Sequence, residues 1–223
     1  MRQQLTGRTF ENVRSFGGSH TYHEIDLDRV KFTGCVLGQQ NDPEFGFVVR
    51  DVTATRCRTD NCRVQGVRFE DVTVDGLATK HQDLGGCLFK HVTLKGRIGP
   101  IMTTPVNRAL PVETREAMNA AMVAYYKDVD WALDISAAEF SDADFYMVPG
   151  DLVRRDPETQ FLLRRDVVAQ AGEESLPIGP RIAASRFEST PFDSIVAVVS
   201  RRSKNFTRDL DEFEQVRKAG LAE

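Results

Sequence analysis

The amino-acid sequence predicts a mainly β protein with some α structure: a short parallel β-helix, interrupted by one helix and followed by an α-helical region. Three observations support this fold class. Near-identical eight-residue stretches recur 20 residues apart in the first half of the chain. Their apolar residues are spaced by steps that sum to five, and beyond about residue 150 the apolar spacing becomes helical.

The repeat is clearest in V-R-D-V-T-A-T-R from Val49, F-E-D-V-T-V-D-G from Phe69 and F-K-H-V-T-L-K-G from Phe89. Looser copies, F-E-N-V-R-S-F-G and F-T-G-C-V-L-G-Q, begin at Phe10 and Phe32. Apolar residues occupy the first, fourth and sixth positions, a spacing that matches neither a helix nor a flat strand. A period of five predicts a four-sided coil of twenty residues, in which each side supplies one large and one small inward residue.

One coil cannot bury its own inward side chains, whereas coils stacked at about 4.8 Å bury them and pair the backbone. We therefore expect Phe69 and Phe89 to be buried and stacked one coil apart. Outward residues should form ladders along the stack, namely Arg50 with Glu70 and Lys90, Asp75 with Lys95, and Thr53 with Thr73 and Thr93.

The five-residue period returns at residues 133–145, L-D-I-S-A-A-E-F-S-D-A-D-F. Ala143-Asp144-Phe145 matches a small residue, Asp or Asn, then Leu or Phe, which is the consensus of the pentapeptide-repeat family. Over roughly residues 24–98 and 129–148 the chain resembles that family, and the resemblance implies a right-handed parallel β-helix, here of about five to six coils. The chain departs from the family pattern in its frequent Val and Cys at the small position and in its interruption. Ser136 and Glu139 could instead form a helix capping box, but that interpretation accounts for fewer residues.

The interruption is predicted to contain a helix at residues 111–127. Pro111 suits a first helical turn, and Glu113 and Glu116 complement the helix dipole. The expected apolar face consists of Val112, Met118, Met122 and Tyr125. If residues 133–145 continue the stack, this helix loops out and packs on its side.

A turn at Pro149-Gly150 is expected to end the second repetitive stretch. The predicted β-helix thus spans residues 1–150, and a C-terminal helical cap spans residues 151–223. Within the cap we predict a helix from Asp156-Pro157 to about residue 171, a loop at 172–190, a helix from Thr190-Pro191 and a last helix at about 206–219 stopped by Gly220. The run S-I-V-A-V-V also suits a strand, but the cap signal and apolar spacing favour a helix. These helices would cover an open end of the stack.

Charge and terminal sequence exclude several classes of function. The net charge is −4, with +2 in residues 1–105 and −6 in residues 106–223, so neither a basic face for nucleic acid nor an acidic imitation of DNA is indicated. The start M-R-Q-Q-L-T-G-R-T-F-E-N-V contains no apolar signal segment, and no apolar run approaches a membrane span. We expect a cytoplasmic protein with reduced cysteines.

Several side chains could carry chemistry, but each has a structural explanation. Cys35, Cys57, Cys62 and Cys87 could hold a soft metal, yet they occupy positions of small inward residues. His20 and His23, three apart in a polar stretch, could share a metal but have no evident third ligand.

His91 aligns with Asp51 and Asp71 on an outward face, where it could be a general base or simply pair with Asp71. The clusters of charged residues likewise have a functional and a structural interpretation. Asp128, Asp130 and Asp134 around Trp131 could bind a cation, and Arg154-Arg155 and Arg164-Arg165 an anionic partner, although arginine pairs more often form ion pairs with acidic residues of their own segment. There is no glycine-rich phosphate loop and no G-x-S-x-G motif.

We therefore assign no catalytic, metal-binding or cofactor-binding residue and no cofactor. The leading hypothesis is a non-catalytic module that presents a rigid solenoid surface to another protein, with toxin neutralisation as one concrete form. The alternative is a small enzyme whose site lies between the β-helix and the helical region and uses His91 or His20 and His23. Some pentapeptide-repeat proteins protect type II topoisomerases by resembling DNA, but the +2 charge of residues 1–105 argues against that role. No nucleic acid or membrane partner is expected, and a homodimer is compatible with this hypothesis.

Overall fold

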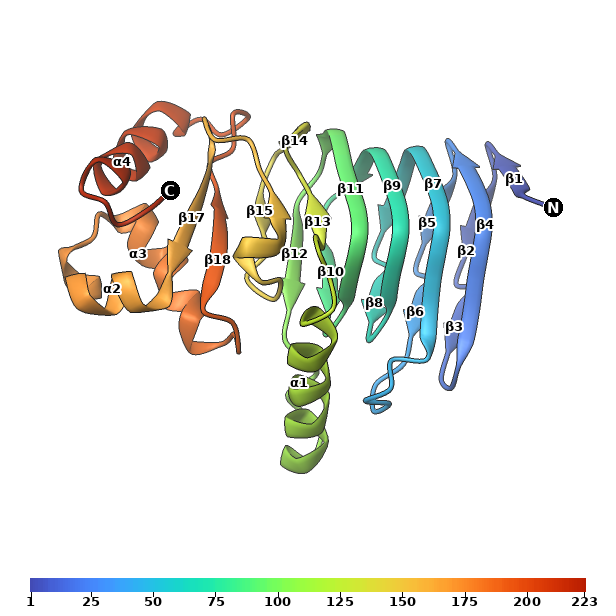
Figure 1. Ribbon diagram of the computed structural model, residues 1–223. Helices are drawn as coiled ribbons and strands as arrows, with labels where there is room; N and C mark the ends of the chain where they lie inside the picture. The colour runs from blue at the N-terminus through green and yellow to red at the C-terminus, as the bar shows by residue number, and fades with distance from the viewer.

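Two largely parallel sheets run along the molecule in the computed structural model, which describes residues 1–223 apart from the side chain of Glu173 (Figure 1). The first sheet has the order β1 (Gln3–Thr6), β4 (His20–Asp28), β7 (Phe47–Asp60), β9 (Arg68–Thr79), β11 (Leu88–Ile98), β13 (Leu133–Asp134) and β16 (Val153–Arg154). Beside this path, β2 (Thr9–Glu11) pairs with β5 (Lys31–Thr33), β5 with β7, and β14 (Ala138–Phe140) with β11. The prediction of a mainly β protein with α structure is confirmed.

The second sheet starts with β3 (Arg14–Phe16), β6 (Val36–Gly38), β8 (Arg63–Gln65) and β10 (Gln82–Gly85). It continues through β12 (Ile101–Thr104), β15 (Ala143–Asp144), β18 (Ser194–Val198) and β17 (Gln160–Arg164). The chain thus alternates between the sheets as it advances, and strands from beyond residue 150 extend both of them.

The pairing register reproduces the repeat found in the sequence. Val49 pairs with Phe69 and Phe69 with Phe89, and the neighbouring threonines and valines pair at the same spacing. The rings of Phe69 and Phe89 are stacked, with centroids 5.8 Å apart. Phe89 is buried but Phe69 only half-buried, so the predicted burial is wrong for Phe69. Phe89 lies one strand farther along the stack than Phe69. Its backbone amide donates a hydrogen bond of 3.2 Å to the hydroxyl of Tyr126.

Positive φ angles recur along the backbone with the same period of five. From β7 to β11 they fall at Asp51, Arg56, Asn61, Gly66, Asp71, Gly76, Gly86, His91 and Gly96. This conformation costs a non-glycine residue roughly 1–2 kcal/mol. The series omits His81, so the same backbone bend recurs at all but one of the five-residue steps in this range.

The interrupted repeat resumes as predicted. Leu133 of β13 pairs with Val92, and Phe140 of β14 pairs with Ile98, so residues 133–145 extend the stack. The insertion contains α1 (Val112–Tyr126), which projects to the side (Figure 1). Met118 and Met122 are buried as predicted, but the helix is rotated so that Tyr126 is buried, Tyr125 half-buried and Val112 half-exposed.

Several predictions for the C-terminal region are wrong. Residues 160–164 form strand β17, and only Arg165–Ala171 form helix α2. Residues 194–198 form strand β18 rather than a helix. β17 and β18 are an antiparallel pair buried over most of their length, with Leu162 opposite Val196. Burial on both faces removes the alternation that distinguishes a strand, so the apolar spacing imitates a helix.

The segment predicted as a loop contains the 3-10 turns η2 (Glu173–Ser175) and η3 (Ser185–Glu188) and helix α3 (Ile178–Ala184). Asp156 does not cap a helix, because its carboxylate accepts bonds from the Glu158 amide and Thr159 hydroxyl in a turn. The predicted turn near residue 150 is the 3-10 turn η1 (Gly150–Leu152). Helix α4 (Phe206–Lys218) and its Gly220 stop, with φ 74°, are confirmed.

The C-terminal elements cover one end of the stack, opposite the N-terminus (Figure 1). β18 joins β15, and Phe213 of α4 stacks on Phe161 of β17 with ring centroids 5.0 Å apart. The chain end is fixed too, since Leu162 and Glu223 exchange two backbone hydrogen bonds of 3.0 Å. Among the described residues, no helix combines the length and apolar character needed to cross a membrane.

Candidate functional site

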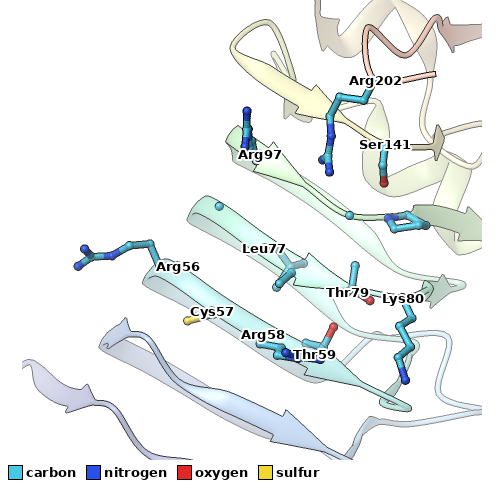
Figure 2. Close-up of a pocket in the computed structure, with 14 residues that line it drawn as sticks. Arg56, Cys57, Arg58, Thr59, Leu77, Thr79, Lys80, Arg97, Ser141 and Arg202 are labelled. Atoms are coloured by element: carbon cyan, nitrogen blue, oxygen red, sulfur yellow. The ribbon is translucent and has the colours of Figure 1, made fainter. Parts of the chain in front are cut away.

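A hollow of ≈ 500 Å³ lies across strands β7, β9 and β11, close to the start of the C-terminal cover (Figure 2). Its charged lining residues are all cations: Arg56, Arg58, Lys80, Arg97 and Arg202. Arg56 and Arg58 lie in β7, Lys80 directly follows β9 and Arg97 lies in β11. Arg202 comes from the segment before α4. Side chains more than 140 residues apart in the sequence therefore build one basic surface.

Small residues form the floor of the hollow. Arg58 pairs with Ala78, and backbone bonds from Gly99 to Leu77 and from Ser141 to Ile98 place Gly99 and Ser141 next in the same outward column. A Cβ at Gly99 would lie 2.4 Å from the Thr79 carbonyl oxygen, so the close approach of the two strands requires glycine here. The pairing of β9 with β11 also shifts between Lys95 and Ile98, and Arg97 lies in this irregularity.

Only part of the positive charge is compensated. Arg56 binds Asp28 at 2.7 Å, while Lys80 and Arg97 lie 3.7 Å from Asp60 and Glu139. Among the described side chains, no carboxylate lies within 4.0 Å of either Arg58 or Arg202. Arg202 donates only to the backbone carbonyls of Ile98 and Glu139, at 3.2 and 3.4 Å. Two guanidinium charges thus remain available to an anion.

Three hydroxyl groups of the lining are also without partners in the described structure. They are Thr59 Oγ1, Thr79 Oγ1 and Ser141 Oγ, each removed from solvent. Figure 2 shows Ser141 and Arg202 pointing from the upper part of the view toward the strands that carry Thr79 and Thr59. These oxygen atoms are not exposed to the hollow, because Thr59 and Thr79 continue the core-facing column of Phe32, on the opposite side of the strand from Arg58. The cations of the lining therefore make the hollow suited to an anionic group.

His91 is the centre of a separate cluster on the first sheet. Its Nδ1 lies 3.0 Å from Asp71 and its Nε2 lies 2.7 Å from Asp130, so the predicted pairing with Asp71 is confirmed. The imidazole also stacks on Trp131, whose other neighbour is the Arg154 guanidinium 4.1 Å from the ring centroid. The carboxylates of Asp130 and Asp71 raise the pKa of His91, and the imidazole in turn lowers that of Asp130.

The other predicted candidates do not converge. The ring of His20 packs near Tyr22 and Phe47, and His23 lies elsewhere on the same strand, opposite Arg50. Asp128 is not part of the His91 cluster, and Asp134 accepts two bonds from Ser136, as its structural interpretation predicts. Within the described residues, no group of three or more His, Cys, Asp or Glu side chains is arranged to hold a metal ion.

The cysteines lie along the stack as free thiols. Cys57 pairs with Leu77 in the first sheet, whereas Cys35 and Cys62 precede the paired residues Val36 and Arg63 in the second. Burial raises the pKa of the Cys87 thiol to about 12. A thiol with so high a pKa is not a nucleophile near neutral pH.

The arginines of the pairs Arg154-Arg155 and Arg164-Arg165 already contact groups of the same chain. Arg164 binds Asp151 at 2.8 Å and Glu223 at 2.9 Å, and Arg155 lies 3.5 Å from Glu223. Arg165 donates to the backbone carbonyls of Phe187, Thr190 and Phe192, which hold the loop before β18. These arginines therefore stabilise the C-terminal region.

A smaller hollow of ≈ 210 Å³ lies at the junction of the repeat and the C-terminal region. It is lined by Ser136–Phe140, Asp156, Thr159, Gln160 and Val198–Arg201, without a histidine. Its Asp156 carboxylate is already engaged by Arg201, at 3.3 Å, and by the Thr159 hydroxyl. The junction thus offers no unengaged acid–base pair.

Searches against protein-family models, curated proteins and solved structures found no match to the chain. The basic hollow was not predicted, because the net charge of residues 1–105 is only +2 and Arg202 lies outside that range. The sequence did contain one indication of the hollow. At the 20-residue spacing Arg58 aligns with Ala78, which places a cation beside a small outward residue on the neighbouring strand.

Proposed function

We propose that the chain is a right-handed parallel β-helix of the pentapeptide-repeat kind that acts as a non-catalytic module for binding another protein. The twenty-residue parallel register, the period of five in both apolar residues and positive φ angles, and the resumption of pairing at Leu133 support this architecture. The basic hollow is the binding surface, and its partner presents anionic groups.

The observation that supports a binding function is the set of cations without acidic neighbours on paired strands. Arg58 stands in β7, which pairs on both sides, with β4 and β5 and with β9. Because the backbone at the site is already ordered, association costs less conformational entropy than it would on a loop. A positive hollow also accelerates encounter with an anionic partner and selects against basic ones.

The histidine and carboxylate groups that could act as an acid or a base are already paired with other side chains, which favours binding over catalysis. Both ring nitrogens of His91 face carboxylates, so the imidazole has no free nitrogen to accept a substrate proton. The carboxylate of Asp156 at the junction is likewise paired. The basic hollow itself contains no histidine and no carboxylate among its described lining residues.

Affinity capture from a lysate of the native cells, with identification by mass spectrometry, tests this function. The bait is the full chain, compared with the double variant Arg58→Glu/Lys80→Glu and with the control Arg63→Glu. Arg63 is an exposed arginine of β8 in the second sheet, whereas the strands that line the hollow, β7, β9 and β11, belong to the first sheet. We expect an acidic protein that the wild type and the control capture stoichiometrically and the double variant does not. Equal capture by all three baits, or no specific capture by the wild type, would refute the proposal.

A further inference from the structure

The end of the stack that carries β1, β2 and β3 is uncovered in the described structure. Each of these strands pairs with one neighbour only, namely β4, β5 and β6 respectively. The opposite end is covered by β17, β18 and the C-terminal helices (Figure 1). We propose that a second copy of this chain binds to the uncovered end, so that two stacks join end to end about a two-fold axis. This interface is separate from the basic hollow.

The backbone of the uncovered end carries donors and acceptors that no described strand uses. The Arg8 carbonyl accepts a hydrogen bond from the Lys31 amide of β5. Because the bonds of a parallel ladder alternate from residue to residue, the amide and carbonyl of Phe10 also face β5, and those of Thr9 and Glu11 face away from it. The same alternation leaves free backbone groups on β1 and β3, at Gln4, Thr6, Arg14 and Phe16.

The inward side chains of this end are arranged symmetrically about Phe10. Within residues 3–16, Leu5, Phe10 and Ser15 are half-buried and all the others are exposed. The ring of Phe10 stacks on Phe32 with centroids 5.4 Å apart, so it heads a column of inward rings. A two-fold axis through Phe10 brings this ring against its own copy and Leu5 against Ser15 of the second copy. Every inward position then meets an inward position.

The same axis lets the free backbone groups pair. It reverses the direction of each strand, so that β2 lies antiparallel to its own copy and β1 lies antiparallel to β3 of the second copy. The residues that stand opposite each other are those with free backbone groups: Thr9 with Glu11, Thr6 with Arg14 and Gln4 with Phe16. Opposed residues of this kind exchange two hydrogen bonds in an antiparallel sheet.

The climb of the coil does not disturb this pairing. Residues before Phe10 lie nearer to the second copy, by the same amount that their mates after Phe10 lie farther from it. The two changes cancel, so the separation between paired strands is the same on each side of the coil.

These features select a second copy over other occupants. A single extended segment could pair with one of the three open strands, whereas a coil end covers all three at once. The charged residues Arg8, Glu11 and Arg14 all face uncharged residues of the second copy, so no like charges are opposed. A head-to-tail contact would need a second open end, which β17 and β18 cover in the described structure. The contact therefore closes at two copies.

Sedimentation velocity of the full chain over a range of concentrations tests the proposal. We expect a monomer–dimer equilibrium without larger species. Glu11→Pro removes an amide that donates across the interface and leaves the bonds to β5 intact, and the preceding Phe10 is already extended, as proline requires. This variant should raise the dissociation constant of the dimer at least about tenfold. Glu11→Ala, which keeps the amide, should change it little.

Paired cysteines test the register without removing a hydrogen bond. The Cα atoms of a hydrogen-bonded antiparallel pair lie about 5.5 Å apart, within the range of a disulfide. The double variant Thr9→Cys/Glu11→Cys should therefore give a covalent dimer on a non-reducing gel after mild oxidation. Each single variant should stay unlinked, because identical positions are not opposed. The wild type, with its four free thiols, is the control for linkage through native cysteines.

The proposal is overturned if the chain is monomeric at every concentration, or if larger species grow with concentration. A dimer that withstands Glu11→Pro and is not linked by the cysteine pair would also overturn it. So would a dimer that Ile178→Glu dissociates, since Ile178 is an exposed residue of α3 at the covered end. None of these outcomes bears on the proposed function, which the capture experiment tests through Arg58 and Lys80.

Discussion

Replacing Phe89 with alanine measures how strongly the stack is held together. The side chain is 3% exposed and lies between the ring of Phe69 and the cover supplied by α1. A buried phenylalanine removes about 150–250 Å² from water, which at about 25 cal/mol per Å² corresponds to about 4–6 kcal/mol. Since alanine keeps part of this burial, we expect Phe89→Ala to lower the free energy of unfolding by about 3–5 kcal/mol.

Phe69→Ala is the matched control, because both variants abolish the same ring stacking at 5.8 Å. Phe69 is only half-buried, so its loss should cost about 1.5–3 kcal/mol. Urea unfolding followed by circular dichroism gives both values, and an unchanged denaturant slope would show that the variants unfold the same structure. Equal losses, or a larger loss for Phe69→Ala, would refute the burial argument.

Three further predictions test other parts of the molecule. The pKa of His91 is raised in the folded state above its ordinary value of 6.5, so its stabilisation is complete below 6.5 and is lost as the pH rises through the folded-state pKa. Asp130→Asn should therefore reduce stability in acidic urea titrations and change it little in alkaline ones; an effect independent of pH would contradict this. Gly99→Ala forces a Cβ against backbone and should destabilise by about 1–3 kcal/mol, whereas Gly85→Ala, with ordinary contacts, should be near neutral in thermal unfolding. In hydrogen exchange, residues 133–145 should be as well protected as strand β11, and rapid exchange would show that their pairing is not stable in solution.

The sequence by itself determined the register of the repeat and the positions of two helices, α1 and α4. The inward positions must be apolar at every five residues, so Phe69 and Phe89 reveal which strands pair and at what offset. Helix α1 packs one face on the repeat and α4 packs one face on strand β17, and each leaves its other face in water, so each keeps a recognisable apolar period. The resumed pairing at Leu133 followed from the same rule.

The tertiary structure alone decided the C-terminal strands and the basic hollow. Residues 194–198 are buried throughout most of their length, so both faces of the strand are apolar and the sequence retains no alternation to mark it. The hollow depends on where the C-terminal region docks, because Arg202 reaches the carbonyls of Ile98 in β11 and Glu139 in β14 only when β18 has joined the second sheet. Electrostatic fields depend on distances in space, and such distances between remote segments are set by packing rather than by any local pattern of residues.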